Sequence, residues 1–306
     1  YGYVQTITTK QNTKIVSTAD IQKRRTMERS VMKMGIISDL ASFEFLRYSL
    51  IATLLVSLST GIVSPIIVYR GMEFIGDGLS HAIFAGVAVA VVANFNVFLG
   101  AILATVVFAY LIYRLNKSEA FLESTAIGIL LPVFMSIGVI VFSKSPRYTT
   151  DVTSYLFGNI LMVVREDLYF LVAVTILSTI VVFANLYKIS YWISDEDMAQ
   201  FYGIRTNTIK LSILFLTSFV VVSALKIAGV IVMGAFLVLP GVFAKISASS
   251  LKQAIFKAIG FNLIASLLGF LISYYFDLPP GPTIVLFGFL LLIISISWNK
   301  WKIETQ

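Results

Sequence analysis

The chain contains no cysteine and a single histidine, and only 13% of its residues are charged. Without thiols it forms no disulfide, no thiolate-ligated zinc site and no iron–sulfur cluster. The phosphate-binding pattern G-x-x-x-x-G-K-[ST] is missing, which excludes binding and hydrolysis of ATP by that route. The H-E-x-x-H pattern of zinc hydrolases is missing as well. These absences argue against an enzyme.

Apolar residues are abundant instead: 58% of the chain is hydrophobic and its mean hydropathy is +0.90. Soluble domains carry roughly 45–50% apolar and about 25% charged residues. A backbone in lipid must satisfy its own hydrogen bonds, so the predicted fold class is all-α: a polytopic transmembrane helical bundle of eight or nine spans within residues 34–300. Nine apolar segments are found, at 48–69, 75–93, 97–115, 124–143, 167–187, 208–225, 227–244, 254–275 and 283–299.

The net charge of +7 is distributed unevenly between the loops, which predicts orientation rather than nucleic-acid binding. One set of loops carries eleven Lys and Arg residues, and the opposite set carries four. The first set is therefore predicted to be cytoplasmic, together with the C-terminal end 301–306. Its members are Arg70, Arg114, Lys117, Lys188, Arg205, Lys210, Lys245, Lys252, Lys257, Lys300 and Lys302, against Lys144, Arg147, Arg165 and Lys226.

The polar, basic N-terminal tail, residues 1–33, conflicts with this orientation, because nine spans put it outside. Three interpretations stay open. The tail is translocated despite its charge, or one span is re-entrant and leaves eight crossings. Alternatively, the native chain begins near Met32 or Met34.

Two ionisable residues interrupt the second apolar segment. From Gly76 to Val92 they are Asp77 and His81, four residues apart and hence on one face of a helix. An Asp inside a membrane costs ~2.5–3.5 kcal/mol, so it normally faces a cavity or a partner. Carboxylate and imidazole suit a divalent metal ion. The pair predicts a metal site in a transport path.

Two other roles for the pair stay open. A buried, hydrogen-bonded pair that ties helices together needs no ligand, and a proton relay would make the chain a secondary transporter or a channel. Glu123, at the start of the fourth segment, is a further candidate ligand. Its alternative role is to stabilise the N-terminus of a helix.

Acidic residues also cluster in a predicted cytoplasmic helix at 194–203. Asp195, Glu196 and Asp197 follow Ser194 as N-cap, and Gly203 ends the helix. Three consecutive residues cannot share one helix face, so a solvated first turn is favoured over a metal cluster.

Several of these motifs, in order over residues 34–298, resemble the membrane permeases of bacterial ABC importers for manganese, zinc and iron. The first runs from Tyr69 to Ala82 and contains both Asp77 and His81. Ala85 and Gly241 depart from many members of that family. The other motifs are Ser154–Leu161, Asp195–Ala199 with Gly203, Gly229–Pro240 and Asp277–Pro282.

The resemblance implies a homodimer of the type II importer arrangement in the bacterial cell membrane. It implies a cytoplasmic ABC ATPase dimer as the separate source of ATP hydrolysis and an extracytoplasmic metal-binding protein that delivers the ion. Asp77 and His81 would lie in the path of the transported manganese, zinc or iron, with no permanently bound cofactor. The ATPase would dock on the loop around Lys245, Ile246, Ser247, Ala248, Ser249, Ser250, Leu251 and Lys252, with Asp195, Glu196 and Asp197 as the second cytoplasmic segment.

The docking loop allows two structures. Its serines and flanking lysines suit a small helix presented to a groove on the partner. The alternative is a tight turn between the seventh and eighth apolar segments.

Overall fold

The computed structural model describes residues 36–117, 121–144 and 163–304. The chain divides into two units, 1–47 and 48–306. The described part of the first unit contains α2 (Ile36–Ser42) and the start of α3 (Glu44–Tyr69). The predicted tail 1–33 and the motif at 154–161 lie outside the described residues, so both stay predictions.

All regular secondary structure in these three ranges is helical, as predicted. Each of the nine apolar segments coincides with a helix or with one half of α11. Eight helices are long and apolar enough to cross a membrane, and the ninth, Val232–Ser247, is shorter. After α2 and α3, the helices in chain order are α4 (Ile75–Val92), α5 (Val97–Lys117), α6 (Glu123–Ser143), α8 (Arg165–Ala184), α9 (Leu186–Ser194), α10 (Glu196–Phe201), α11 (Thr206–Ser247), α12 (Leu251–Phe276) and α13 (Pro280–Glu304).

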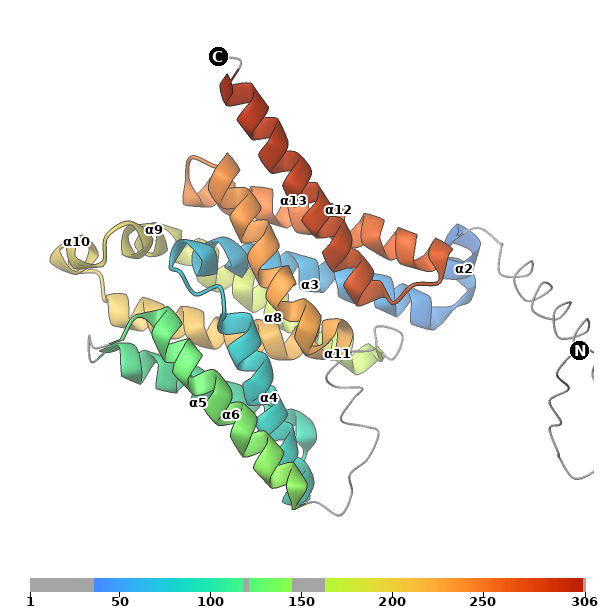
Figure 1. Ribbon diagram of the computed structural model, residues 1–306, viewed down its shortest axis with the longest axis horizontal. Helices are drawn as coiled ribbons and strands as arrows, with labels where there is room; N and C mark the ends of the chain where they lie inside the picture. The colour runs from blue at the N-terminus through green and yellow to red at the C-terminus, as the bar shows by residue number, and fades with distance from the viewer. Residues whose placement is uncertain (1–35, 118–120, 145–162, 305–306) are drawn as a thin grey trace, which may run out of the picture. The chain divides into compact units, whose positions relative to one another are not determined.

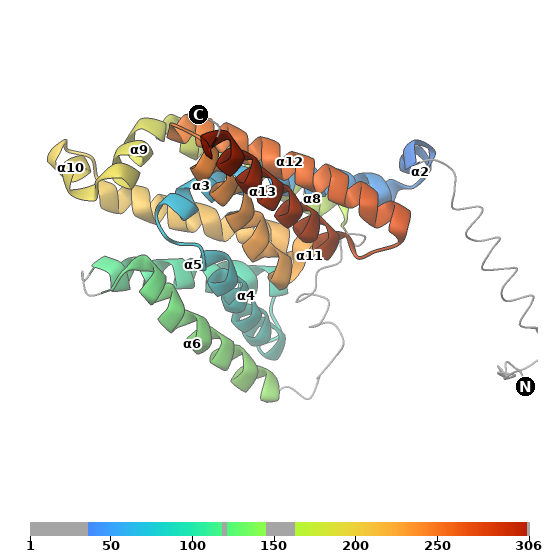
Figure 2. The same ribbon diagram turned by 45° about the horizontal axis from the view of Figure 1, so that its top comes forward.

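Helix α11 is two helices joined by a sharp kink. Gly229 has φ 72° and ψ 169°, a left-handed conformation that L side chains rarely adopt. At this point the chain turns back, and the second half of α11 returns toward the end of the bundle at which the first half starts (Figures 1 and 2). The sixth and seventh apolar segments are therefore separated by one glycine rather than by a polar loop.

Small residues let α4 approach its neighbours closely. A Cβ added at Gly100 of α5 would lie 2.6 Å from the carbonyl oxygen of Gly86 in α4. A Cβ at Gly78 would lie 2.6 Å from the ring of Phe108. Close backbone approach is the main route to helix association in lipid, where apolar burial gives little driving force. These contacts fix α4 between α5 and α6.

A polar seam joins α3, α12 and the second half of α11. Ser57 Oγ of α3 donates to Ser266 Oγ of α12 at 2.5 Å. The Asn262 amide of α12 donates to Thr60 Oγ1 at 2.8 Å and to the Phe236 carbonyl of α11 at 3.4 Å. Pro240 has no N–H and therefore leaves the carbonyl of Phe236, four residues earlier, without a helical partner. Asn262 satisfies this carbonyl and so ties α11 to the seam.

We expect Gly86→Leu to destabilise the protein by about 1–3 kcal/mol or to prevent folding, because the added side chain meets the α5 backbone. The measurement is thermal unfolding of the detergent-solubilised protein, together with its elution profile in size-exclusion chromatography. Gly260→Leu is the matched control, since nothing lies within 4 Å of a Cβ at Gly260. Equal stability of the two variants would contradict the close α4–α5 contact.

Candidate functional site

One stripe of helix α4 is only partly covered in the described structure. Most of the helix is buried, but Asp77, His81 and Phe84 are only partly buried. Their spacing of four and three residues places them on one face. The predicted pair therefore lies where α4 is open to a ligand or to another protein surface.

The carboxylate of Asp77 lies directly against the second half of α11. A Cβ added at Gly234 would be 2.7 Å from Asp77 Oδ1, and a Cβ at Gly76 would be 3.3 Å from the Gly234 Cα atom. Two glycines thus bring the helices close enough for backbone to pack on the carboxylate. Within the described ranges Asp77 forms no ion pair with Lys or Arg. Sequence reasoning did not identify Gly234, although the small residue in an apolar span was a signal.

His81 also lacks a partner. Its Nδ1 atom is buried and has no hydrogen-bond partner among the described residues. A buried nitrogen without a partner loses its hydration and gains nothing in return. Imidazole nitrogen and carboxylate oxygen are both common ligands of divalent transition metals. The observed donor set therefore fits a metal ion that binds transiently.

The described residues bring only two candidate ligands together at this site. No group of three or more His, Asp or Glu side chains that could hold a metal ion occurs in residues 36–117, 121–144 and 163–304. Glu123 therefore does not lie together with Asp77 and His81 in such a group.

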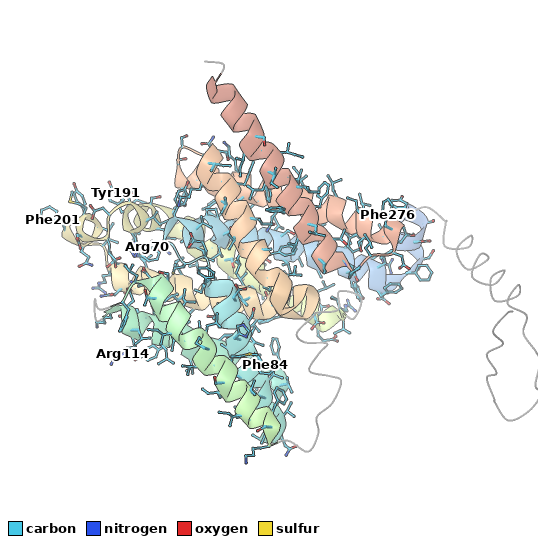
Figure 3. All side chains as sticks on the ribbon, in the orientation of Figure 1. Arg70, Phe84, Arg114, Tyr191, Phe201 and Phe276 are labelled. Atoms are coloured by element: carbon cyan, nitrogen blue, oxygen red, sulfur yellow. The ribbon has the colours of Figure 1, made fainter. Side chains whose placement is uncertain are left out.

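Glu123 lies in an ion-pair cluster at one end of the bundle. Its Oε1 atom is 2.8 Å from Arg70 Nη2 and 3.0 Å from Lys210 Nζ. Arg70 also binds Glu196 Oε2 at 2.8 Å. The cluster joins four parts of the chain: the residue after α3, the start of α6, helix α10 and the start of α11. Figure 3 labels Arg70 at this end. Glu123 is thus held by two cations in this structure.

Arg70 additionally fixes Trp192 of α9. Its guanidinium carbon lies 4.4 Å from the centroid of the Trp192 ring, and its Nη1 atom donates to the Trp192 carbonyl at 3.2 Å. Trp192 is fully buried. The sequence indicated Arg70 as a cytoplasmic charge and as part of the Tyr69–Ala82 motif. Its contacts with Glu123, Trp192 and Glu196 could not be predicted from the sequence.

The predicted acidic helix exists as α10, with one correction. Asp195 is the N-cap, not Ser194: its Oδ1 atom accepts from the Met198 N–H at 2.9 Å. A carboxylate caps as well as a hydroxyl and adds charge at the positive helix end. Asp197 is exposed, whereas Glu196 pairs with Arg70. Gly203 has φ 76° and ends the segment as predicted.

The predicted docking segment, Lys245–Lys252, contains no separate helix. Helix α11 continues to Ser247 and α12 begins at Leu251, so only residues 248–250 lie between them. The expectation of a small presented helix is wrong, because Ser250 already caps α12 by accepting from the Gln253 N–H. The tip remains accessible: Ser249 and Ser250 are exposed.

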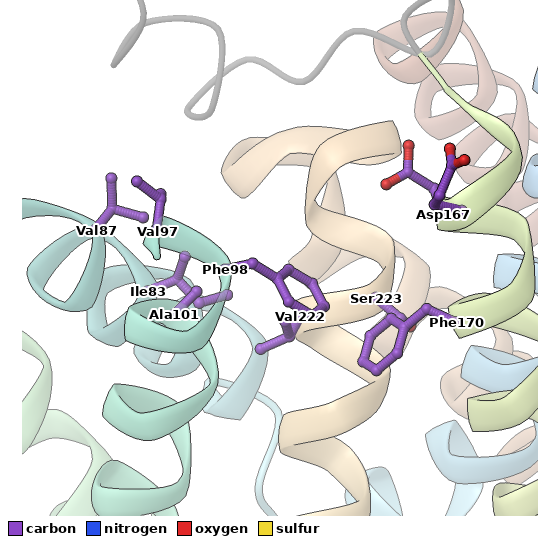
Figure 4. A pocket seen from close by; sticks show the side chains of 10 residues that line it. Ile83, Val87, Val97, Phe98, Ala101, Asp167, Phe170, Val222 and Ser223 are labelled. Carbon is purple, nitrogen blue, oxygen red and sulfur yellow. The ribbon is translucent and has the colours of Figure 1, made fainter. Parts of the chain in front are cut away.

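A cavity of about 320 Å³ lies between α4, α5, α8 and α11 (Figure 4). Its lining is mainly apolar, with Phe98 and Phe170 on two sides, and Asp167 lies at its edge. Asp167 Oδ2 accepts from the Val164 N–H at 2.9 Å, which caps α8. Capping accounts for this carboxylate, and the cavity is not lined by Asp77 or His81.

This arrangement of helices is shared with known transport proteins. The chain is 42% identical over 267 residues to a probable metal transport system membrane protein of Thermotoga maritima, covering 87% of this chain and 94% of that one. It is 30% identical over 264 residues to the manganese transport system membrane protein MntC of Listeria innocua, covering 86% and 93%. The structure of PsaBC from Streptococcus pneumoniae in complex with Fab matches with a TM-score of 0.75 and 32% identity, covering 85% and 93%. The sequence profile of the ABC 3 transport family matches residues 42–299, and the chain is thus a multi-pass membrane protein that belongs to this family.

Proposed function

We propose that this chain is the permease subunit of an ATP-driven importer of divalent transition metal ions. Family membership and relatives named for metal or manganese transport support the class of cargo. A further relative, from Haemophilus influenzae, is named as a probable iron transport system membrane protein. The names of the relatives give manganese and iron as candidate ions, and the nitrogen and oxygen ligands of the pair add zinc.

The observation that carries the proposal is the pair of unsatisfied donors on α4. Among the described residues, the buried Nδ1 atom of His81 has no hydrogen-bond partner, and Asp77 on the same face forms no ion pair with Lys or Arg. Two copies of the chain, related by a two-fold axis, supply two carboxylates and two imidazoles to one ion. That set suits tetrahedral coordination, or a higher number when waters join.

The energy source and the delivery of the ion are assigned to partners. The chain has no nucleotide-binding loop, so a cytoplasmic ABC ATPase dimer drives transport through a contact with the turn between α11 and α12. An extracytoplasmic metal-binding protein delivers the ion to the opposite side. The distribution of Lys and Arg supports the placement of that turn in the cytoplasm.

The rival function is proton relay through Asp77 and His81 in a secondary transporter or channel. A relay needs hydrogen-bonded neighbours that pass the proton on. The absence of any such neighbour at His81 Nδ1 in the described residues favours the metal ion. Transport by the purified chain without an ATPase would support the rival.

The ligand chemistry of the proposed site is compatible with all three metals. Carboxylate oxygens suit manganese, whereas imidazole suits zinc and iron. A mixed set of two oxygens and two nitrogens accepts all three. Metal-resolved uptake in cells that carry only this importer identifies the cargo.

We expect Asp77→Ala and His81→Ala each to reduce metal uptake by roughly tenfold or more, because each removes one ligand type from both protomers. Uptake is measured in cells or proteoliposomes by elemental analysis, and assembly with the ATPase is checked by co-purification. Ser80→Ala is the control on the same helix, since Ser80 Oγ only donates to the Gly76 carbonyl. Wild-type accumulation in either variant would refute the assignment.

Gly234→Ala tests the position of the carboxylate without removing it. The new Cβ displaces Asp77 Oδ1, so we expect uptake to fall by roughly tenfold while thermal stability stays near that of the wild type. Gly288→Ala is the control, because its Cβ meets only ordinary contacts, at 3.4 Å from Leu239 Cδ1 and 3.6 Å from Ala265 Cβ. If Gly234→Ala transports normally, the contact with α11 does not position Asp77.

Crosslinking tests the docking turn in this cysteine-free background. A cysteine at the exposed Ser249 is expected to trap the ATPase subunit through a short bifunctional reagent, and the product is detected by gel shift. A cysteine at Gln200, exposed on α10, is the comparison. Trapping from residue 200 but not from residue 249 would move the docking site to the acidic helix.

A further inference from the structure

A second cavity, of about 560 Å³, lies at the end of the bundle that carries α9 and α10. It is enclosed by the last turns of α8, by α9, by the segment after α10 and by the first turns of α11. Figures 1 and 2 show these elements side by side at one end of the 48–306 unit. Neither Asp77 nor His81 contributes to its lining, so it is distinct from the metal site.

The polar lining of this cavity is positive. Lys188 and Arg205 are its two charged residues, and none of the residues that line it is acidic. Within the described part of the chain, neither cation forms an ion pair or hydrogen bond. The acidic residues of neighbouring α10 form no ion pair with them among the described residues: Glu196 pairs with Arg70, Asp195 caps its own helix, and Asp197 is exposed. Two exposed cations therefore line a cavity whose lining residues supply no counter-charge.

The backbone adds to this positive potential. Arg205 occupies the N-cap of α11, where no side chain caps the helix. The N–H groups of Thr206 and Thr208 donate to the backbone carbonyls of Ile204 and Arg205. The positive end of the helix dipole lies there, so a cation is unfavourable and an anion is favourable. An arginine at this position becomes favourable when an anion lies between it and Lys188. The hydroxyl of Thr208 lines the same cavity, as does that of Ser212, which donates to the Thr208 carbonyl at 2.8 Å.

The remainder of the lining includes Asn185 and Tyr202 and an apolar part that lies beside the lipid-facing surface. Val181 of α8 and Ile213 of α11 belong to spans, and Leu177 and Ile180 of α8 are exposed nearby. The same end carries exposed aromatic side chains, those of Tyr187, Phe201 and Tyr202. The ring of Tyr191 packs between those of Tyr187 and Tyr202. Figure 3 labels Tyr191 and Phe201 there. Exposed aromatic side chains at the end of a span are typical of the headgroup level of a bilayer.

We propose that this cavity binds the phosphodiester headgroup of an anionic phospholipid, with Lys188 and Arg205 as its cationic contacts. The first part of the acyl chains lies against Val181 and Ile213. A soluble phosphate satisfies the same charges but gains nothing from the apolar lining or from the aromatic rim. The proposal depends on membrane insertion and on this cavity, not on the identity of the transported ion.

The test is native mass spectrometry of the delipidated, detergent-solubilised permease–ATPase complex, titrated with phosphatidylglycerol or phosphatidylcholine. The wild type is expected to bind phosphatidylglycerol preferentially. Lys188→Gln combined with Arg205→Gln should lower that affinity by about twentyfold or more, since each cation contributes separately. Arg114→Gln combined with Lys117→Gln removes equal charge from the last turn of α5 and should leave the affinity unchanged.

A second variant separates loss of binding from loss of folding. Ser212→Trp fills the cavity without altering charge and should also abolish the preference, with the elution profile and thermal unfolding as controls. Unchanged binding of phosphatidylglycerol to either variant would overturn the proposal. Displacement of the lipid by millimolar inorganic phosphate would reassign the site to a soluble anion. Binding of the lipid to the permease alone but not to the permease–ATPase complex would make this face a protein contact.

Discussion

Hydrocarbon offers no hydrogen bonds, so each interruption of a helix inside the membrane must be repaired by the protein itself. Helix α11 carries two such interruptions, Gly229 and Pro240. The carbonyl of Phe236, which loses its partner to Pro240, accepts from Asn262, and the neighbouring carbonyl of Leu237 accepts from Ser64 Oγ. These two bonds attach the second half of α11 to α3 and α12. The position of that short helix is therefore specified by polar contacts rather than by apolar packing alone.

The same short helix connects the two parts of the proposed mechanism. Near its start, Gly234 packs on the carboxylate of Asp77, and at its end Ser247 leads into the exposed turn before α12. In the proposed mechanism, a displacement of the turn would reach Asp77 through about three and a half turns of one helix, without an intermediate loop. Lys257 Nζ donates to the Ser247 carbonyl, which ties the end of α11 to α12. Docking at the turn and the position of Asp77 would thus be linked through the same helix.

Most of the fold follows from the sequence because long apolar runs have few alternatives in a membrane. The nine segments were predicted to within a few residues, and the shared face of Asp77 and His81 follows from their spacing alone. The partners of Glu123 were not predictable, since Arg70 and Lys210 come from distant segments and meet only in the folded bundle. The place of Gly241 finds its explanation in space: a Cβ there would lie 2.6 Å from Ser64 Oγ, which donates to α11. The cap of α10 was misplaced by one residue because Ser194 and Asp195 are equally good caps in isolation.

The contrast between the two groups of ionisable residues gives the clearest argument for function. One group lies at the end of the bundle, and its two acids and two bases neutralise one another, so their burial requires no ligand. Its members are Glu123, Glu196, Arg70 and Lys210. Asp77 and His81 lie inside a span, where the described residues offer neither a Lys or Arg for the carboxylate nor a hydrogen bond for the buried nitrogen. Burying such groups without partners is unfavourable, and a protein that needed only stability would replace them with apolar residues. In the proposed function this state would serve a passing cation: the ion would be stabilised while bound, without competition from a described internal partner.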